Sequence, residues 1–250
     1  MKHIGQNPRL RYDEGCLGAH ALNLVGDRWA LLVARELMFQ PKRFQMLRAG
    51  LPGVTASVLS QRLAQMIAAG VVQHAPEPGL YALTPAGRAL HPVLRELCRW
   101  ALLMPGHDPQ RFISISALMI SISATVDAGR AAGSPLRGGF VSGPEGFVVT
   151  LDAAGAPLVR ADPAPRADFV LTGSGNALAA AIYGPGPAVL AQSGRIALHG
   201  DSAAAQDFAA LFSLRPQSRD RSASPDETEQ LPGDSSTSSS VTTPSSASSA

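Results

Sequence analysis

The sequence predicts an α+β protein in which a mostly helical N-terminal part with one β-hairpin precedes a part that mixes strands and helices. Over residues 15–105, apolar side chains recur every three to four positions, which is typical of amphipathic helices. Residues 106–214 alternate strand-like and helix-like patterns. Residues 215–250 contain twelve serines and almost no large apolar side chain. That segment cannot bury enough apolar surface to offset its ordering entropy, so we expect a disordered tail.

Composition excludes several classes of protein. The chain has 250 residues, of which 45% are hydrophobic and 16% are charged, a length suited to one large domain or two small ones. Two cysteines are too few for a disulfide framework. No apolar run approaches the roughly 20 residues that span a bilayer, and the start carries no stretch of signal-peptide type. We therefore expect a cytoplasmic protein without a membrane segment.

The expected domains follow from shifts in composition. The turn-forming residues of 104–109 mark the best boundary. We expect a flexible arm over 1–14, a first domain over 15–105, a second domain over 106–214 and the disordered Ser-rich tail over 215–250.

Charge is distributed unevenly along the chain, although the net charge is only +2. Residues 1–105 hold twelve basic and six acidic residues, whereas the rest of the chain is net acidic. No acid lies between Glu36 and Glu77, a stretch that includes Lys42, Arg43 and Arg62. Such a segment would attract a polyanion, because each phosphate contact also releases counterions.

Caps and breakers set the limits of the N-terminal helices. Gly26 ends the first helix, Asp27 can cap the second and Pro41 ends it. Thr55 caps a later helix, and Gly70 stops it. We expect helices over 17–25, 27–38, 44–48 and 55–69, then a hairpin of 71–74 and 80–83, and finally one long helix over 84–100.

This order of helices followed by a hairpin is that of a winged helix, whose second motif helix enters the DNA major groove. The open face of 55–69 carries small polar side chains, which can hydrogen-bond base edges. Basic side chains nearby would contact phosphates and set the register. An ordinary solvated surface is the alternative. The DNA-binding candidates are Lys42, Arg43, Thr55, Ser57, Ser60, Gln61 and Arg62.

Residues 16–104 resemble the HxlR-type winged helix-turn-helix regulators. The resemblance implies a homodimeric transcription factor that pairs through the first and last helices of this domain and favours a palindromic operator. The matching strings are Leu24-Val25-Gly26-Asp27-Arg28-Trp29, Arg43-Phe44, Leu51-Pro52-Gly53-Val54, Leu59-Ser60-Gln61-Arg62-Leu63, Ala69-Gly70-Val71-Val72 and Tyr81-Ala82-Leu83-Thr84-Pro85-Ala86-Gly87-Arg88.

The wing departs from the pattern of this family, and the role of one cysteine stays open. The short wing carries Glu77 at its tip, and this carboxylate would repel a phosphate. Cys16 lies where some family members carry a redox- or electrophile-sensing thiol, so it is a redox candidate. Asp13 and Glu14 precede it and oppose a lowered thiol pKa, and a packing role is the alternative. Cys98 suits packing in a dimer core.

The second domain shows its own pattern of short elements. Residues 112–126 fit a helix by spacing, although their alternation also fits a strand. We expect strands over 140–141, 147–151, 157–160, 168–172 and 195–199, and helices over 176–182, 189–192 and 202–212.

Residues 110–213 resemble the sterol carrier protein family, most clearly at Asp168–Thr172 and 193–201. The resemblance implies a sheet covered by helices around an apolar cavity. An apolar ligand would then be expected. Ordinary core packing is the alternative for every candidate. The candidate wall residues are Phe169, Leu171, Leu178, Ile182, Leu190, Ile196, Leu198, Phe208, Leu211 and Phe212.

These features together predict a dimeric DNA-binding transcriptional regulator that represses by occupying a promoter and senses a hydrophobic small molecule through its second domain. The alternative is a lipid-binding carrier or scaffold that uses the winged helix mainly to dimerise. The six histidines are dispersed and no P-loop or nucleophile elbow is present. We therefore expect no catalytic residue, no metal and no cofactor.

Overall fold

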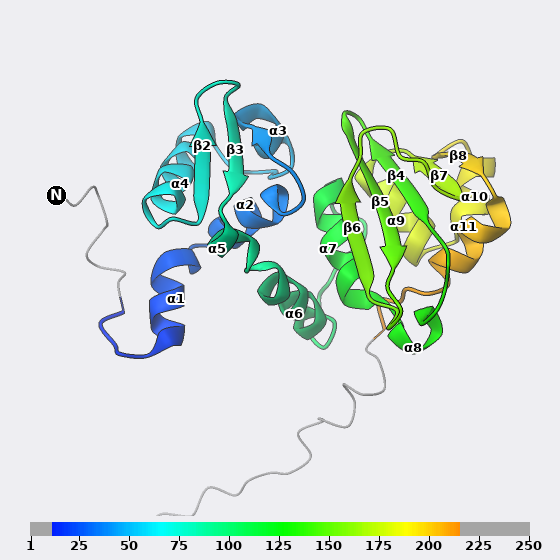
Figure 1. Cartoon of the computed structure of the whole chain (residues 1–250), viewed down its shortest axis with the longest axis horizontal. Helices are drawn as coiled ribbons and strands as arrows, with labels where there is room; N and C mark the ends of the chain where they lie inside the picture. The colour runs from blue at the N-terminus through cyan, green and yellow to red at the C-terminus, as the bar shows by residue number, and fades with distance from the viewer. Residues whose placement is uncertain (1–11, 216–250) are drawn as a thin grey trace, which may run out of the picture. The chain divides into compact units, whose positions relative to one another are not determined.

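The computed structural model describes residues 12–215 (Figure 1). The expected arm over 1–14 and tail over 215–250 lie outside this range except for their innermost residues. Tyr12 is attached to the first helix, because its backbone N–H donates to Oδ1 of Asn23 at 2.8 Å and its carbonyl accepts from Nδ2 at 2.9 Å. No helix within 12–215 is both long and apolar enough to cross a membrane.

The N-terminal half is a winged helix-turn-helix, as expected. Its three strands pair antiparallel in the order β1-β3-β2, so the hairpin gains a short third strand that the sequence pattern did not predict. The helices are α1 (Leu17–Val25), α2 (Ala30–Leu37), α3 (Phe44–Ala49), α4 (Ala56–Ala68), α5 (Pro85–Arg88) and α6 (His91–Ala101), and the strands are β1 (Lys42–Arg43), β2 (Val72–Ala75) and β3 (Leu80–Leu83).

The prediction of one helix over 84–100 is wrong, because the structure divides it into α5 and α6. Thr84 caps α5 by accepting the Gly87 N–H at 3.1 Å, as its position suggested. Pro92 lies in the first turn of α6. Proline has no N–H to donate to the carbonyl four residues earlier and its ring clashes there, so a helix cannot run through it undisturbed. Pro92 is the signal that the sequence interpretation missed.

Asp27 does not cap α2 directly. The residue at the cap position is Trp29, which makes no side-chain capping bond. Asp27 instead accepts the Trp29 N–H through Oδ1 at 2.9 Å, in the turn that precedes the helix.

The C-terminal half is an α+β fold built on a five-stranded sheet with the order β6-β5-β4-β7-β8. Only the β4–β7 pair is parallel. In Figure 1 the sheet lies in front of α9 and α11. The elements are α7 (Ile115–Thr125), α8 (Ala128–Ala131), β4 (Gly138–Ser142), β5 (Glu145–Leu151), β6 (Pro157–Ala161), β7 (Phe169–Thr172), α9 (Gly175–Tyr183), α10 (Pro187–Gln192), β8 (Ala197–Gly200) and α11 (Ser202–Ala209).

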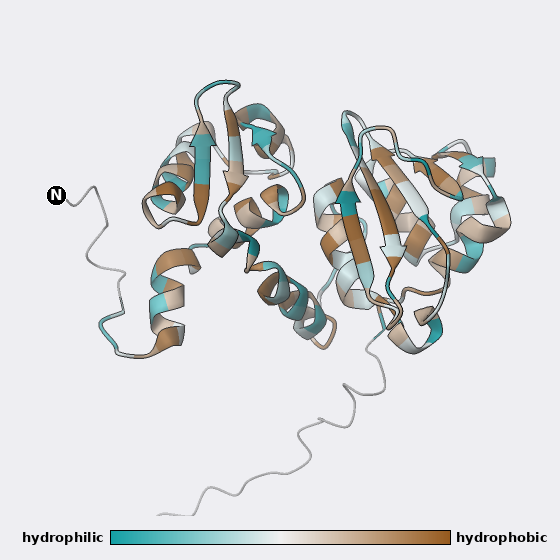
Figure 2. Cartoon of the chain, viewed as in Figure 1, coloured by the Kyte–Doolittle hydropathy of each residue, from teal (hydrophilic) through white to brown (hydrophobic). Residues whose placement is uncertain are grey.

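Aromatic rings fill the space between this sheet and its helices. The rings of Phe169 and Phe208 meet at 5.3 Å and those of Phe208 and Phe212 at 5.0 Å. Phe140 lies 6.0 Å from Phe208. Such tilted and edge-on pairs are the favoured aromatic geometries. Brown, apolar strands mark the same sheet in Figure 2.

Helix α7 resolves the ambiguity over 112–126 in favour of the helix, and it packs against both halves. Its residues from Ile115 to Ile120 are all buried, which is typical of a helix enclosed on every side. Leu118 belongs to the C-terminal core, whereas Ile120 belongs to the N-terminal core. Phe39 also packs against both cores. The two halves therefore form one compact unit over the described residues.

Candidate functional site

Helix α4 presents the polar face that the sequence predicted. Thr55 is its N-cap, and its hydroxyl oxygen accepts the Val58 N–H at 3.3 Å. Leu59, Leu63 and Met66 point into the core. Three polar side chains of α4, Ser57, Ser60 and Gln61, remain exposed away from the core. The N-terminal half of α4 therefore carries hydrogen-bonding groups that no core contact occupies.

The two arginine candidates differ in their freedom. Arg43 is exposed on β1. Arg62 is mostly buried, with its guanidinium paired to Asp27 at 2.5 Å and hydrogen-bonded to Gln65. Arg43 is thus free to reach a phosphate, while Arg62 links α4 to the turn before α2. A role for either arginine at DNA stays a prediction.

The structure contradicts the prediction that Lys42 contacts phosphate, because its side chain is fully buried. Successive strand residues point to opposite faces, so β1 turns Lys42 inward and Arg43 outward. The Lys42 ammonium contacts Glu36 at 3.1 Å, Glu145 at 2.6 Å and the Ser116 hydroxyl at 3.0 Å. An ammonium has three donors, and all three are used.

Further bonds complete this buried cluster around the two carboxylates. Glu36 accepts from the Ser114 hydroxyl at 2.6 Å and pairs with Arg35 at 2.9 Å. Glu145 accepts from Gln40 Nε2 at 2.8 Å. We call Glu36, Lys42, Ser114, Ser116 and Glu145 the ion cluster. It joins α2 and β1 of the winged helix to α7 and β5 of the second half.

One sequence signal for the ion cluster was available and missed. Glu36 lies among the buried positions of α2, next to Leu37 and three residues after Val33. An acid on an apolar helix face needs a buried cation as partner, since unpaired buried charge is costly. Lys42 is a nearby basic residue, but the partner Glu145 is more than one hundred residues away in sequence.

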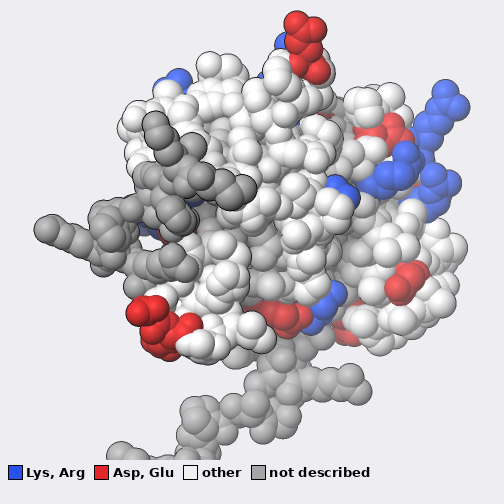
Figure 3. Space-filling view, turned by 60° about the vertical axis from the view of Figure 1, so that its left-hand side comes forward, with Lys and Arg blue, Asp and Glu red and all other residues white. Residues whose placement is uncertain are grey.

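The wing and the visible surface carry little positive charge. His74 stacks on Tyr81 with ring centroids 4.3 Å apart, and Glu77 is exposed at the hairpin tip. In the view of Figure 3 most of the surface is uncharged, and the basic and acidic side chains form small separate groups. Recognition of a polyanion on this side would therefore depend on a few basic residues and on neutral hydrogen-bonding groups.

Cys16 is exposed at the N-cap of α1, so it does not pack within the described residues. The backbone N–H groups of Ala19 and Gly18, at the start of α1, lower the pKa of its thiol. Cys98 is the opposite case. Burial raises the pKa of its thiol, and the charge of Arg35, which lowers it, offsets only part of that effect. Of these two thiols, Cys16 is the one with the properties of a reactive cysteine.

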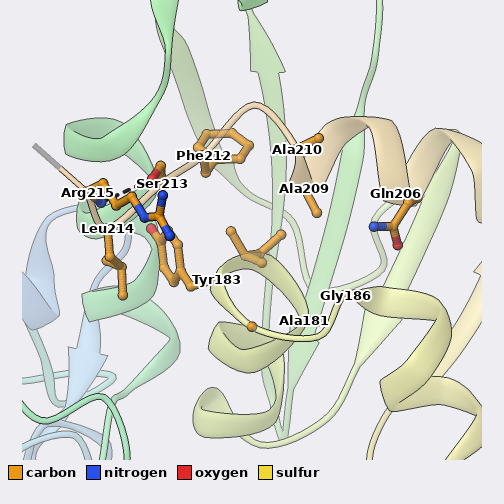
Figure 4. Close-up of a pocket in the computed structure, with 12 residues that line it drawn as sticks. Ala181, Tyr183, Gly186, Gln206, Ala209, Ala210, Phe212, Ser213, Leu214 and Arg215 are labelled. Carbon is orange, nitrogen blue, oxygen red and sulfur yellow. Dashed lines mark hydrogen bonds between the residues drawn. The ribbon is translucent and has the colours of Figure 1, made fainter. Parts of the chain in front are cut away.

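The predicted wall residues of the apolar cavity belong to the C-terminal core or pack against it, and their contact with a ligand stays a prediction. Nine of the ten are buried and Leu198 is half-buried. Ile182 and Phe212 line a pocket of about 370 Å³ at one end of α9 and α11. Figure 4 shows Tyr183, Phe212 and Arg215 gathered at one end of this pocket and Gln206 at the other. Burial raises the pKa of Tyr183, whose hydroxyl lies 2.9 Å from that of Thr125.

Comparison with known families gives two matches. Residues 24–109 match the HxlR-like helix-turn-helix family, and residues 140–213 match the SCP-2 sterol transfer family. Both resemblances that the sequence suggested are confirmed.

Individual relatives match the N-terminal half. The uncharacterised HTH-type transcriptional regulator YvaP of Bacillus subtilis is 36% identical over 86 residues, which are 32% of this chain and 80% of YvaP. A Mycobacterium tuberculosis HTH-type regulator, Rv3095, is 38% identical over 35% of this chain, but the match spans only 58% of that protein. The quinone-bound crystal structure of B. subtilis YodB is 31% identical, covers 36% of this chain and 99% of YodB, and has a TM-score of 0.33.

Replacing Lys42 tests the ion cluster. Lys42→Met keeps the apolar stem but removes the buried cation that Glu36 and Glu145 share, so we expect a loss of about 3–5 kcal/mol in the free energy of unfolding. Urea denaturation followed by circular dichroism measures it. Arg43→Met, one residue along the same strand, is the control and should change stability by about 0.5 kcal/mol or less. A stable Lys42→Met protein that has lost only DNA affinity would restore the phosphate-contact interpretation.

The thiol environments predict selective alkylation. Because its pKa is lowered, Cys16 should react with iodoacetamide with a pH midpoint below that of a cysteine in an unstructured peptide, and Cys98 should react far more slowly. Mass spectrometry of the protein alkylated over a pH series measures both rates, with Cys16→Ser as control. Faster labelling of Cys98 than of Cys16 would contradict this assignment.

Proposed function

This chain belongs to the HxlR-like helix-turn-helix family, and on that basis we propose that it is a transcriptional regulator that binds a palindromic operator as a homodimer. The observation that supports this proposal most directly is the exposed polar face of α4. Ser57, Ser60 and Gln61 lie there together, while the other face of the helix is buried. Ser and Gln side chains can both donate and accept hydrogen bonds at base edges.

The elements around α4 supply the remaining parts of a DNA-binding surface. Thr55 fixes the start of the helix, where free backbone N–H groups favour a phosphate. Arg43 is an exposed cation in the same domain. The ion cluster removes Lys42 from this surface, so base contacts carry more of the affinity than the basic count of the sequence suggested.

Exposed apolar side chains on α1 and α6 support dimerisation. Four apolar side chains recur at helical spacing along α6 and the turn after it, and their exposed fractions lie between 43% and 58%. They are Val93, Leu97 and Trp100 on the helix and Met104 just beyond it. On α1, Leu17 and Leu22 are also exposed. Contiguous apolar surface of this kind marks interaction sites. Pairing of two copies through these helices would cover it and place two α4 helices on one DNA duplex.

The second half of the chain gives the regulator an input. An SCP-2 sterol transfer domain follows the winged helix in the same polypeptide and contacts it through α7 and the ion cluster. We infer that this domain senses a hydrophobic small molecule and that the unliganded dimer represses by occupying a promoter. To act as an effector, the molecule must bind one arrangement of the dimer more tightly than another.

A carrier or scaffold protein is the second candidate function. The acidic wing tip and the burial of Lys42 favour it, since both weaken attraction to DNA. The two functions differ in the salt dependence of binding to duplex DNA. If the chain is a regulator, its affinity for operator DNA should fall steeply as the salt concentration rises. If it is a scaffold, it should bind no duplex above the non-specific level.

Substitutions on α4 and β1 should have separable effects on DNA binding. Arg43→Ala should weaken binding to every duplex and reduce the slope of log affinity against log salt by about 0.9. Gln61→Ala and Ser57→Ala should cost about 1–3 kcal/mol on the operator alone, as lost base contacts do. Fluorescence anisotropy on operator and scrambled duplexes measures both, with the exposed Arg195→Ala as control. Equal losses on both duplexes from all three variants would show that the reading face is wrong.

Charge placed on α6 should separate the dimer. Leu97→Glu or Trp100→Glu puts a carboxylate in the apolar stripe, where it would be desolvated without a partner. Light scattering coupled to size exclusion should show the mass halved. Val189→Glu, at an equally exposed apolar residue of α10, is the matched control and should leave the mass unchanged. A dimer that survives both α6 substitutions would place the interface elsewhere.

A further inference from the structure

A second pocket, of about 240 Å³, lies where the winged helix meets the sterol-carrier half. It is smaller than the roughly 300–1,000 Å³ of pockets that hold drug-sized ligands, so its occupant is a small molecule. One wall comes from the end of α2 and from α5 and α6, and the other comes from α7 and from β6, the edge strand of the sheet. The wall residues that matter for recognition are Phe39, Arg88, His91, Ser123 and Leu158.

The walls are mainly apolar, and part of that apolar surface is uncovered. Leu158 is 56% exposed on β6. Phe39 presents its ring between His91 and Phe147, with centroid distances of 5.9 Å to each. Met38 and Val159 extend the same surface. These contacts suit a flat apolar body.

Two polar side chains of the pocket lining, His91 and Arg88, have donor groups without a partner in the described residues. Nε2 of His91 is buried and has no hydrogen-bond partner within residues 12–215. Buried polar atoms of folded proteins nearly always have partners, so this nitrogen points to an absent one. Arg88 uses one guanidinium nitrogen to donate to the Leu83 carbonyl at 2.8 Å and forms no ion pair with any other described residue.

The charge of the pocket decides the kind of head group. Arg88 is cationic, and none of the pocket's lining residues is acidic. Burial, with a smaller contribution from Arg95, lowers the pKa of His91. An imidazole has a donor N–H in either protonation state, so His91 can donate one hydrogen bond. A carboxylate can accept from both groups, whereas a cation would meet Arg88 without a counter-charge.

From this geometry we infer that the pocket is an effector site for a small apolar carboxylic acid, with its flat body against Phe39 and Leu158 and its carboxylate at His91 and Arg88. The inference deepens the proposed function and, in its regulatory part, rests on it. His91 is the first residue of α6, the helix proposed to pair the dimer, so a ligand held there contacts both the sensor half and the dimer helix. Binding would thereby favour one arrangement of the two DNA-reading helices.

The site is tested on the full chain with 1-naphthoate and with the neutral alcohol 1-naphthalenemethanol. Titration calorimetry should show the carboxylate binding about tenfold more tightly than the alcohol, as expected for a charge-assisted hydrogen bond. In NMR spectra the ring signals of His91 should shift on addition of naphthoate, while those of His74 and His199, both exposed, should not. Absence of binding at millimolar naphthoate, or equal affinity for the two compounds, would overturn the inference.

Paired substitutions locate the ligand, so the test does not depend on the folding of any single variant. Leu158 is exposed, so Leu158→Glu and Leu158→Lys should both fold, and only Leu158→Glu should repel the carboxylate and weaken binding. Arg88→Gln and His91→Leu should each weaken it about tenfold, whereas Arg215→Gln, in the other pocket, should leave it unchanged. Equal binding by the two Leu158 variants, or loss of binding in Arg215→Gln, would overturn the assigned site.

Regulation is measured separately, so its failure can be told apart from failure of the site. Saturating naphthoate should change operator affinity about fivefold or more, the lower end of ordinary allosteric coupling. An unchanged operator affinity with naphthoate bound would refute the effector role. A protein that binds naphthoate but no duplex DNA would refute the regulator proposal and leave the binding site standing.

Discussion

Burial of one lysine constrains much of this molecule. A charged ammonium can remain in a protein interior only when its donors are satisfied, and Lys42 satisfies all three with Glu36, Glu145 and Ser116. These partners come from α2, the start of β5 and α7, so the requirement holds the winged helix and the sterol-carrier fold together. The same constraint removes a cation from the surface, so the proposed recognition of DNA depends on the exposed face of α4.

This connection gives a physical route between an input and an output. Helix α7 contributes Ile120 to the N-terminal core and Leu118 to the C-terminal core. A displacement of α7 in one half therefore changes the packing in the other. Interiors packed in this way transmit displacement because they do not compress. The pocket beside His91 lies along the same boundary, at the start of the helix that carries the exposed apolar stripe. A small molecule bound there would act on the relation between the two halves without touching α4.

Local signals predicted most of the elements, and long-range partners account for most of the errors. Caps such as Thr55 and stops such as Gly26 act within one turn, so the limits of α1 and α4 could be predicted to within a residue. Pro92 was also a local signal, and overlooking it merged α5 with α6. Lys42 is different, because its partner Glu145 is brought near only by the tertiary fold. The acid-free window therefore suggested a phosphate contact where the chain had built a buried ion pair. Whether a cavity exists depends on how Phe169 and Phe208 fit together, which composition cannot specify.

We propose that the start of α4 lies in the groove of DNA, and hydrogen–deuterium exchange on the operator complex tests this placement most directly. The first amides of a helix have no intrahelical partner and exchange readily in the free protein. Saturation with operator duplex should slow exchange over residues 55–61 at least about tenfold, while exchange in β5 and α9 should be unchanged. Unaltered exchange over 55–61 together with protection elsewhere would contradict it.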